Sequence, residues 1–302
     1  MVAMVKGDFS RLLEPGINKI FGDYARHPTE YSEIFEIARS SKAREYDQNM
    51  HGIGQAVVQP EGIAVQYDSF GQGPNKVYEH VAYGIGFIIT HQAMVDNLYM
   101  DQMQRGAKHC ALSMKTTKEN VAANVLNRAF NSSYTGWDGL ELCSTAHLLS
   151  KGGTMSNELA TPIALSEVAL EQIMINLGSM TDDAGMPVAA KGQKIIIPPA
   201  LEFEAQRILK SELQYNTADN AINVLKSGRY LPKGFAVNHY LTSTSAYFVL
   251  TDVENGLKMF QREDMIIKND SDFDTDNLKY KAYERYSVGW SDFRHIYGTA
   301  GV

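Results

Sequence analysis

The histidines are the first residues that could act in acid–base chemistry or bind a metal ion, because imidazole titrates near neutral pH and is a frequent metal ligand. Eight are present, and none belongs to an HxH, HxxxH or HExxH pattern. His91 and His109 fall on one expected helix, but they are about five turns apart and cannot share one ion. The spacing therefore predicts no histidine metal site.

Acidic residues form one concentrated run, DSDFDTD at 270–276, which resembles the start of a calcium-binding loop. Such a loop needs glycine at its sixth position and a glutamate that binds through both oxygens at its twelfth. Thr275 and Lys281 occupy these two positions here. We therefore interpret the run as a solvated acidic turn.

Catalytic motifs are absent in any complete form. Gly84 and Gly86 follow an expected strand, but no third glycine follows at the dinucleotide-binding spacing, and neither a P-loop lysine nor a GxSxG elbow occurs. One enzyme hypothesis stays open: a metal-dependent hydrolase that would combine His147 with the acidic run 270–276. The sequence otherwise predicts no enzyme, no catalytic residue, no cofactor and no metal site.

The composition indicates a globular chain made in a reducing compartment. Of 302 residues, 44% are hydrophobic, which is enough for one large or two modest cores. The net charge of −7 argues against a protein that binds nucleic acid through clustered lysine and arginine. Cys110 and Cys143 form no CxxC or Cys/His pattern, which excludes a disulfide framework. The start of the chain is unlike a signal peptide, and the most apolar segment, 81–89, is much shorter than the ~20 residues that cross a bilayer.

The elements that would position these residues begin with an arm at 1–50. Pro15 and Pro28 interrupt it, a short helix is expected around Ile34 and Ile37, and a polar stretch follows. The arm has too few apolar residues for a core of its own. We therefore expect it to lie on another surface.

A long hairpin is expected at 52–83. Its first strands are predicted at 57–58 and 63–67, turn residues gather at 69–75, and the alternating run 77–83 is predicted to pair back with the first strands. An isolated hairpin is marginally stable in water. This one should therefore need a partner surface.

Helical periodicity follows at 90–128, where apolar residues recur at three- and four-residue steps and no proline intervenes. As one helix the segment would span ~60 Å at 1.5 Å per residue. A break near Thr116 and Thr117 would give two helices instead, and an ordinary pair of core helices is the alternative to a single rod.

Regular elements fill the rest of the chain after a loop at 136–157. Helices are predicted after Ser166, as a cap, and after Pro198 and Pro199. Strands are predicted at 194–197, 235–241, 247–251, 257–261 and 280–290. A hairpin turn at 254–256 is expected to join 247–251 to 257–261. The pattern as a whole predicts an α+β protein with an arm and a protruding hairpin.

Three blocks of sequence resemble the Mu-type major head subunit family. They are GLELCSTAH at 139–147 with Asn157 after it, the stretch 165–211 with MTDDAGMP and IIIPPALE, and the stretch 256–294 with GLKMFQRE, YKAYERY and GWSDFR. Their order and spacing carry the resemblance, which covers most of 136–301 and is weaker before residue 90. The family has the Hong Kong 97-type capsid fold.

The resemblance implies a division of the chain. It implies an N-terminal arm at 1–50, an extended loop at 51–89, a peripheral domain with its spine helix at 90–159, an axial domain at 160–258, and strands at 259–302 that return to the peripheral domain. The arm and the hairpin would then find their missing partner on neighbouring subunits. The expected contact residues on the extended loop are Val57, Val65, Tyr67, Phe70, Val77 and Tyr78.

The function implied is that of a major capsid protein of a tailed phage or Mu-type prophage. The chain would assemble with itself into hexameric and pentameric capsomers of an icosahedral shell, which encloses double-stranded DNA without sequence-specific binding and without a membrane. A scaffolding protein separate from this chain and a portal are expected partners, and a decoration or cement protein is a further candidate. The expected location is the virion capsid, assembled in the host cytoplasm.

Two further points concern the same fold. An encapsulin-like bacterial nanocompartment shell is the alternative function. Some members of the fold crosslink a hairpin lysine to an asparagine of a neighbour; Lys76 is the only lysine of the expected hairpin, and the resemblance gives no reason to assign a crosslink to it.

Overall fold

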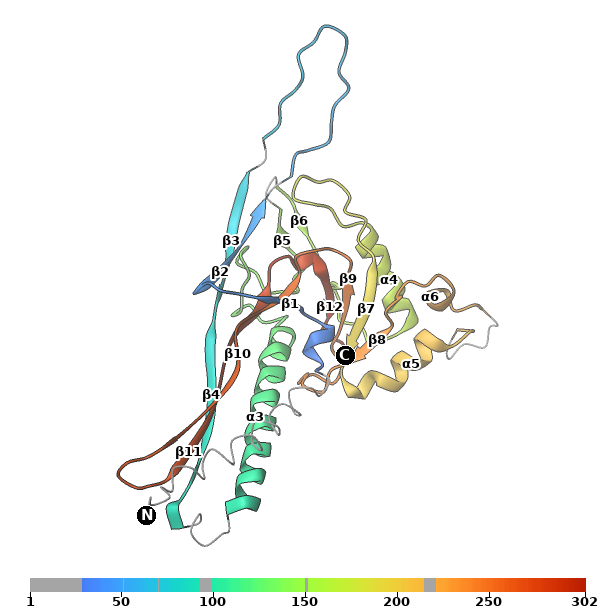
Figure 1. Ribbon diagram of the computed structural model, residues 1–302. Coiled ribbons are helices and arrows are strands. Elements are labelled where there is room, and N and C mark those ends of the chain that lie inside the picture. The colour runs from blue at the N-terminus through green and yellow to red at the C-terminus, as the bar shows by residue number, and fades with distance from the viewer. Residues whose placement is uncertain (1–28, 51, 70, 93–98, 150–151, 215–220) are drawn as a thin grey trace.

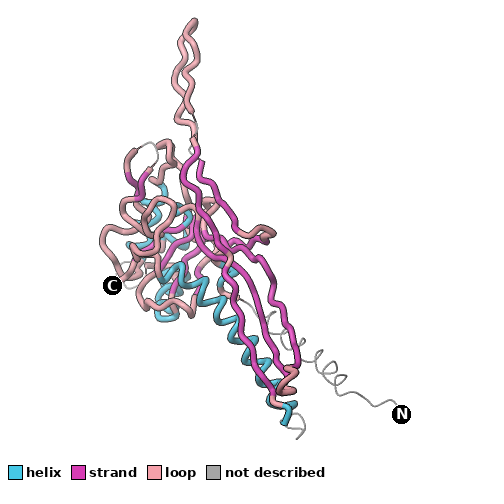
Figure 2. The backbone as a smooth tube through the Cα atoms, turned by 90° about the vertical axis from the view of Figure 1, so that its left-hand side faces the viewer, coloured by secondary structure: helices cyan, strands magenta, loops and turns pink. Residues whose placement is uncertain are grey.

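Two four-stranded sheets organise the chain in the computed structural model (Figure 1). The structure describes residues 29–302 except 51, 70, 93–98, 150–151 and 215–220. A long helix lies beside the first sheet, and a thin extended loop projects from one end of the molecule. The axis of the first sheet and that of the long helix run in nearly the same direction (Figure 2).

The first sheet has the strand order β1-β10-β11-β4. Its strands are β1 (Glu36–Arg39), β10 (Leu257–Ser271), β11 (Leu278–Trp290) and β4 (Val81–Ile89). Helix α3 (Tyr99–Asn127) packs on one face, because the small side chains of Ala107 and Ala111 allow close approach to Tyr280 and Ala282. Alternation along β11 buries every second residue near this helix, as expected for a half-exposed strand.

The second sheet has the order β12-β9-β7-β8. Its strands are β12 (Ile296–Thr299), β9 (Tyr247–Thr251), β7 (Gly192–Ile197) and β8 (Phe235–Val237). Three helices cover one face, namely α4 (Glu167–Gly178), α5 (Glu202–Lys210) and α6 (Val224–Ser227). Ser166 caps α4, with its Oγ accepting from Ala169 N at 3.2 Å, and Pro199 begins the 3-10 turn η2 (Pro199–Leu201) before α5.

A shared core joins the two sheets. Phe248 and Ile296 on the other face of the second sheet pack with Leu126 of α3 and with Met259 and Tyr286 of the first sheet. All five side chains are at most 1% exposed. The carboxyl-terminal end of α3 is therefore fixed between both sheets, whereas its first half contacts the first sheet alone.

A two-stranded ribbon continues beyond the first sheet toward the projecting loop. It consists of β2 (Arg44–Met50) and β3 (Gln72–Glu79), which pair antiparallel from Arg44 opposite Glu79 to Met50 opposite Gln72. The remaining short elements are the 3-10 turns η1 (Tyr31–Glu33) and η3 (Phe293–His295) and the strand pair β5 (His147–Leu148) and β6 (Thr154–Met155).

Three sequence expectations about local structure are wrong. The described residues of 52–69 contain no strand; β3 pairs with β2, and β4 pairs with β11, because those surfaces lie next to each other in the fold. The short helix expected around Ile34 is the turn η1 followed by strand β1. The turn at 254–256 is present, but it passes the chain from the second sheet to the first, so β9 and β10 are not a hairpin.

The long helical segment is a single helix over its described length, Tyr99–Asn127. Thr117, where a break was possible, donates its hydroxyl to Ser113 O at 2.8 Å within the helix. This bond satisfies the side chain without ending the helix. The alternative of two helices broken at this point is therefore wrong.

Candidate assembly interfaces

The projecting loop at 52–69 exposes apolar side chains without burying them in its own subunit. Val57 is 61% exposed, Val65 56% and Tyr67 90%. Val58 and Ile63 are exposed beside them. A monomeric soluble protein rarely presents so many apolar side chains on one extended segment unless another molecule covers them.

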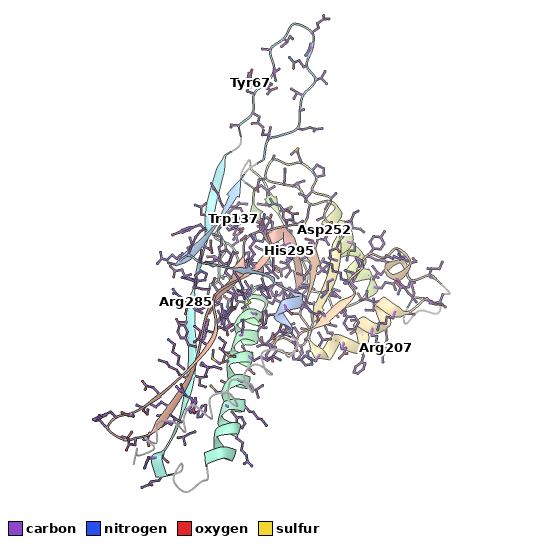
Figure 3. The ribbon with its side chains drawn as sticks, viewed as in Figure 1. Tyr67, Trp137, Arg207, Asp252, Arg285 and His295 are labelled. Atoms are coloured by element: carbon purple, nitrogen blue, oxygen red, sulfur yellow. The ribbon has the colours of Figure 1, made fainter. Side chains whose placement is uncertain are left out.

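The base of this loop is closed by one described bond, in which Gly54 N donates to Asp68 Oδ2 at 2.8 Å. Beyond it the loop extends away from both sheets, and Tyr67 lies far from the crowded body around Trp137 and His295 (Figure 3). Because the loop projects from the body, its side chains are not part of the subunit's hydrophobic core and can reach a neighbouring molecule.

The ribbon below the loop is fastened to the carboxyl-terminal part of the chain. The Tyr78 hydroxyl lies 2.5 Å from Ser291 Oγ, and its ring meets Phe260 edge-on at 4.9 Å between centroids. Lys76 Nζ lies 4.5 Å from the centroid of the Trp290 ring, a cation–π contact. Burial lowers the pKa of Lys76, with the charge of Asp138 acting in the opposite direction.

Two of the predicted contact residues, Tyr78 and Val77, lie on this ribbon and differ in how much of the side chain is exposed. Tyr78 is 3% exposed and packs inside its own subunit, which leaves little of its side chain free to contact a neighbour. Alternation alone cannot tell a side chain that packs internally from one that packs on a neighbour. Val77, on the opposite side of the ribbon, is 40% exposed. Phe70 lies outside the described residues.

His80 stands where the ribbon becomes the first sheet, between β3 and β4. Its Nε2 lies 3.1 Å from Ser40 Oγ and its Nδ1 lies 3.0 Å from Ser287 Oγ. Burial, helped by the positive charges of Arg285 and Arg262, lowers the pKa of His80 below its ordinary value of 6.5, against a smaller opposing effect of Glu45. The neutral ring therefore joins three strands at the root of the ribbon.

No sequence motif distinguishes His80 from the other histidines. The available signal was a titratable side chain within the alternating run 77–83, beside the buried Tyr78. Periodicity cannot show that the chain changes partner strands at that residue. Only the pairing of β3 with β2 and of β4 with β11 does so.

Helix α3 holds the start of the described chain. The Glu119 carboxylate accepts from Glu30 N at 3.0 Å and from Tyr31 N at 3.1 Å. Burial raises the pKa of this carboxyl group, while the two backbone bonds act in the opposite direction. Glu30 in turn binds His239, with 2.8 Å between Oε1 and Nδ1. The point from which the arm departs is therefore tied to both α3 and the loop after β8.

His147, the centre of the hydrolase hypothesis, is a structural residue in this fold. Its Nδ1 lies 2.5 Å from Asp138 Oδ2, its Nε2 lies 3.1 Å from Asn157 Oδ1, and its ring stacks on Phe293 at 3.8 Å. Both ring nitrogens face oxygen acceptors, and the residue is 1% exposed. Both ring nitrogens are engaged by these contacts inside the protein, so neither is presented to a metal ion in solution.

The acidic run 270–276 forms the turn between β10 and β11. Lys279 neutralises part of it, with its Nζ 2.7 Å from Asp272 Oδ2. Figure 1 places this turn at the opposite end of the molecule from β5, which carries His147. The two halves of the proposed hydrolase site are therefore not brought together, and the solvated-turn interpretation agrees with the geometry.

Among the described residues, no group of three or more histidine, cysteine, aspartate or glutamate side chains could hold a metal ion. Within those same ranges, no helix combines the length and the apolar character that spanning a bilayer requires.

A comparison with protein families decides what kind of protein has this geometry. A family model described as a phage capsid protein matches residues 75–298, well over half of the chain. The chain belongs to this phage capsid protein family. The match includes β4, β10 and β11 of the first sheet, α3 and nearly all of the second sheet. The chain is a structural major capsid protein. No curated protein matches it in sequence.

Solved structures agree on the fold of this phage capsid protein. The virus-like particle from Pyrococcus furiosus is similar over 94% of this chain and 98% of its own, with a TM-score of 0.56 and 12% identity. Microbacterium phage Oxtober96 is similar over 91% of both chains, with a TM-score of 0.53 and 9% identity. The capsid of Myoviridae phage XM1 covers 88% of this chain and 90% of its own, with a TM-score of 0.53 and 8% identity.

These likenesses confirm two expectations drawn from the sequence. The capsid protein has the Hong Kong 97-type capsid fold, as the three resembling blocks implied. Its place is the virion capsid, where it forms part of the shell. The family match favours a phage capsid over the encapsulin-like alternative.

Proposed function

We propose that this phage capsid protein assembles into hexameric and pentameric capsomers of an icosahedral shell that encloses phage double-stranded DNA. The observation that carries the proposal is the loop at 52–69, whose apolar side chains stay at least half exposed in their own subunit. A neighbouring subunit is the surface that would bury them. Val57, Val65 and Tyr67 are the contact residues we propose, with Val77 beside them.

The division into functional parts is part of the same proposal. Residues 1–50 act as the arm, 51–89 as the extended loop, 90–159 as the peripheral domain with its spine helix, 160–258 as the axial domain, and 259–302 as the returning strands. Under this division the first sheet takes β1 from the arm segment, β4 from the extended loop, and β11 and most of β10 from the returning segment. In the second sheet, β7, β8 and β9 of the axial domain are joined by β12 from the returning segment.

Further partners follow from the chemistry of a shell. We propose that a scaffolding protein and a portal take part in assembly in the host cytoplasm, and that a decoration protein is a further candidate. The net charge of −7 suits a wall that holds DNA without binding its sequence. The protein is proposed to have no enzymatic activity, because the most promising catalytic residue, His147, is buried and fully hydrogen bonded.

One experiment tests this function. The chain is expressed with and without a cognate scaffolding protein, and the products are examined by negative-stain microscopy. Closed shells built from six- and five-fold capsomers are expected. Small soluble oligomers under every assembly condition would contradict the proposal.

A further inference from the structure

Strand β4 forms an open edge of the first sheet. It pairs with β11 from Val81 opposite Tyr286 to Ile89 opposite Leu278. No described segment pairs with its other side, because the sheet order ends at β4. The backbone N–H and C=O groups of such an edge are a template for one more strand.

This edge lacks the features that normally protect an edge strand. Proteins blunt open edges with charged side chains, prolines, bulges or short strands. Strand β4 has nine residues, VAYGIGFII, without a charge or a proline, and its register with β11 has no shift. Val81 and Ile85 are 50% and 41% exposed although they lie on the face that α3 covers farther along. The edge is therefore long, regular and apolar, and no strand of the described part of the chain covers it.

The projecting loop contains a segment that has the sequence pattern of a strand but does not pair with one among the described residues. Residues 63–67, IAVQY, alternate in the way a strand does, with Ile63, Val65 and Tyr67 on one side and all three well exposed. The described part of the chain gives this segment no strand partner. Its described backbone contacts are both at Ile63, whose N–H donates to Pro60 O at 3.3 Å and whose C=O accepts from Gln59 Nε2 at 2.7 Å. Within its described ranges, the same chain therefore carries an unpaired strand-like segment, 63–67, and an unpaired strand edge, that of β4.

The two cannot meet within one subunit. The loop and β4 leave opposite ends of strand β3, and Figure 1 shows the loop pointing away from the first sheet. Residues 63–67 could therefore reach the β4 edge only of a second copy. A contact between two different surfaces of identical copies is heterologous, and such contacts form a ring when the rotation between copies closes.

We propose that residues 63–67 of one copy add to the β4 edge of a neighbouring copy as a fifth strand of its first sheet. The inference rests on the proposed shell function and specifies how its extended loop binds. Backbone hydrogen bonds would supply the attachment, as in other cases of strand addition. Ile63, Val65 and Tyr67 would lie beside Val81 and Ile85 and cover them.

A proline scan tests the backbone part of this proposal. In an added strand, successive N–H groups point alternately toward and away from the partner, so only every second one bonds to β4. Ala64→Pro and Gln66→Pro should therefore behave alike, and Val65→Pro should behave oppositely, with at least a tenfold difference in shell yield. The subunit should stay folded in all three, because none of these N–H groups has a described backbone partner. Equal effects at the three positions would overturn the proposal.

The edge itself is tested with Ile85→Lys, which adds a charge beside the open backbone of β4. Its control is Ile266→Lys, which puts the same charge on an equally exposed residue of the interior strand β10. Shell yield should fall at least tenfold in the first variant and stay near that of the wild type in the second. Equal loss in both would overturn the assignment of the contact to the edge.

Hydrogen exchange separates this inference from the proposed function. In wild-type shells, the amides of 63–67 and the alternate edge amides of β4 should exchange at least tenfold more slowly than in the soluble subunit. If shells form but the amides of 63–67 and β4 do not exchange more slowly, the proposed capsid function stands and the proposed strand addition is contradicted. If no shells form, a synthetic peptide of residues 61–69 is added to the soluble subunit. Protection at β4 would support the inference, and its absence at saturating peptide would overturn it.

Discussion

The ammonium group of Lys118 on α3 forms a buried ion pair with the carboxylate of Glu284 on β11. Gln261 on β10 completes the contact, because its amide oxygen accepts from Lys118 at 2.8 Å and its amide nitrogen donates to Glu284 at 2.8 Å. Lys118 also lies over the rings of Tyr31 and Tyr286. One side chain thus joins the long helix, the first sheet and the start of the described chain.

Removing one partner of this pair should destabilise the subunit strongly. Lys118→Met leaves the Glu284 carboxylate buried without its cation, and we expect a loss of about 3–5 kcal/mol in the free energy of unfolding. The double variant with Glu284→Leu should recover much of that loss, since no charge is then left unpaired. Urea denaturation of the soluble subunit provides the measurement, and additive effects of the two substitutions would contradict the pairing.

Asn157 is expected to be the most sensitive amide of the loop that carries His147. Its Nδ2 donates to three backbone oxygens, those of Leu142, Phe293 and Ile296, at 2.8, 3.0 and 3.2 Å. Asn157→Asp keeps the shape but turns a donor into an acceptor, so about 3 kcal/mol or more of stability should be lost. Asn131→Asp, at an exposed turn, is the control and should stay within about 0.5 kcal/mol of the wild type. Thermal unfolding distinguishes the two.

The pH dependence of stability should report His80. Its pKa is lowered in the folded subunit, so just below pH 6.5 the unfolded chain binds more protons than the folded one at this site. The stability that the neutral ring contributes is therefore full above pH 6.5 and is lost as the pH falls toward the lowered folded pKa.

His80→Gln tests this dependence because it keeps a polar side chain but does not titrate. Urea midpoints measured from pH 7.5 to 4.5 should show a shallower loss of stability below pH 6.5 than in the wild type. His109→Gln, which removes an exposed imidazole from α3, controls for the loss of a histidine as such. An unchanged slope in His80→Gln would contradict the role of the buried ring.

Glycine at position 298 is required by packing in β12. A Cβ there would lie 2.6 Å from Cys143 Sγ and 3.0 Å from Phe248 Cδ1, closer than real Cβ contacts. Gly298→Ala should cost about 1–3 kcal/mol of stability through overpacking. Gly178→Ala, at the end of α4 with open space around its Cβ, should be neutral or slightly stabilising. Equal stability of the two variants in a denaturation experiment would contradict this difference.

Substitutions in the projecting loop should separate folding from assembly. Val57→Ser and Tyr67→Ser remove apolar groups that are largely exposed in their own subunit, so the free energy of unfolding should change by no more than about 0.5 kcal/mol. Shell formation should fall in both, because the groups lost are the ones proposed to bind a neighbour. Microscopy and sedimentation of the same preparations compare the two effects. Normal shells from both variants would remove these residues from the proposed interface.

Much of the fold follows from local patterns in the sequence. Three- and four-residue apolar steps predicted α3, the Ser166 cap predicted α4, and alternation at 280–290 predicted most of β11. These elements are determined locally because each buries one side of itself with a fixed period, whatever lies opposite. The same patterns, with the resembling blocks after residue 136, were enough to predict the capsid fold.

Tertiary structure alone decided which strands pair and which apolar residues stay outside. Alternation in 63–67 and in 77–83 looks the same, yet β3 and β4 find partners on β2 and β11, while 63–67 finds none in the subunit. Tyr78 and Tyr67 illustrate the consequence, since one is buried and the other almost fully exposed. Period-two patterning specifies that a segment has an apolar side. It does not specify the partner, which depends on surfaces distant in the chain or, as we propose for the projecting loop, on another copy.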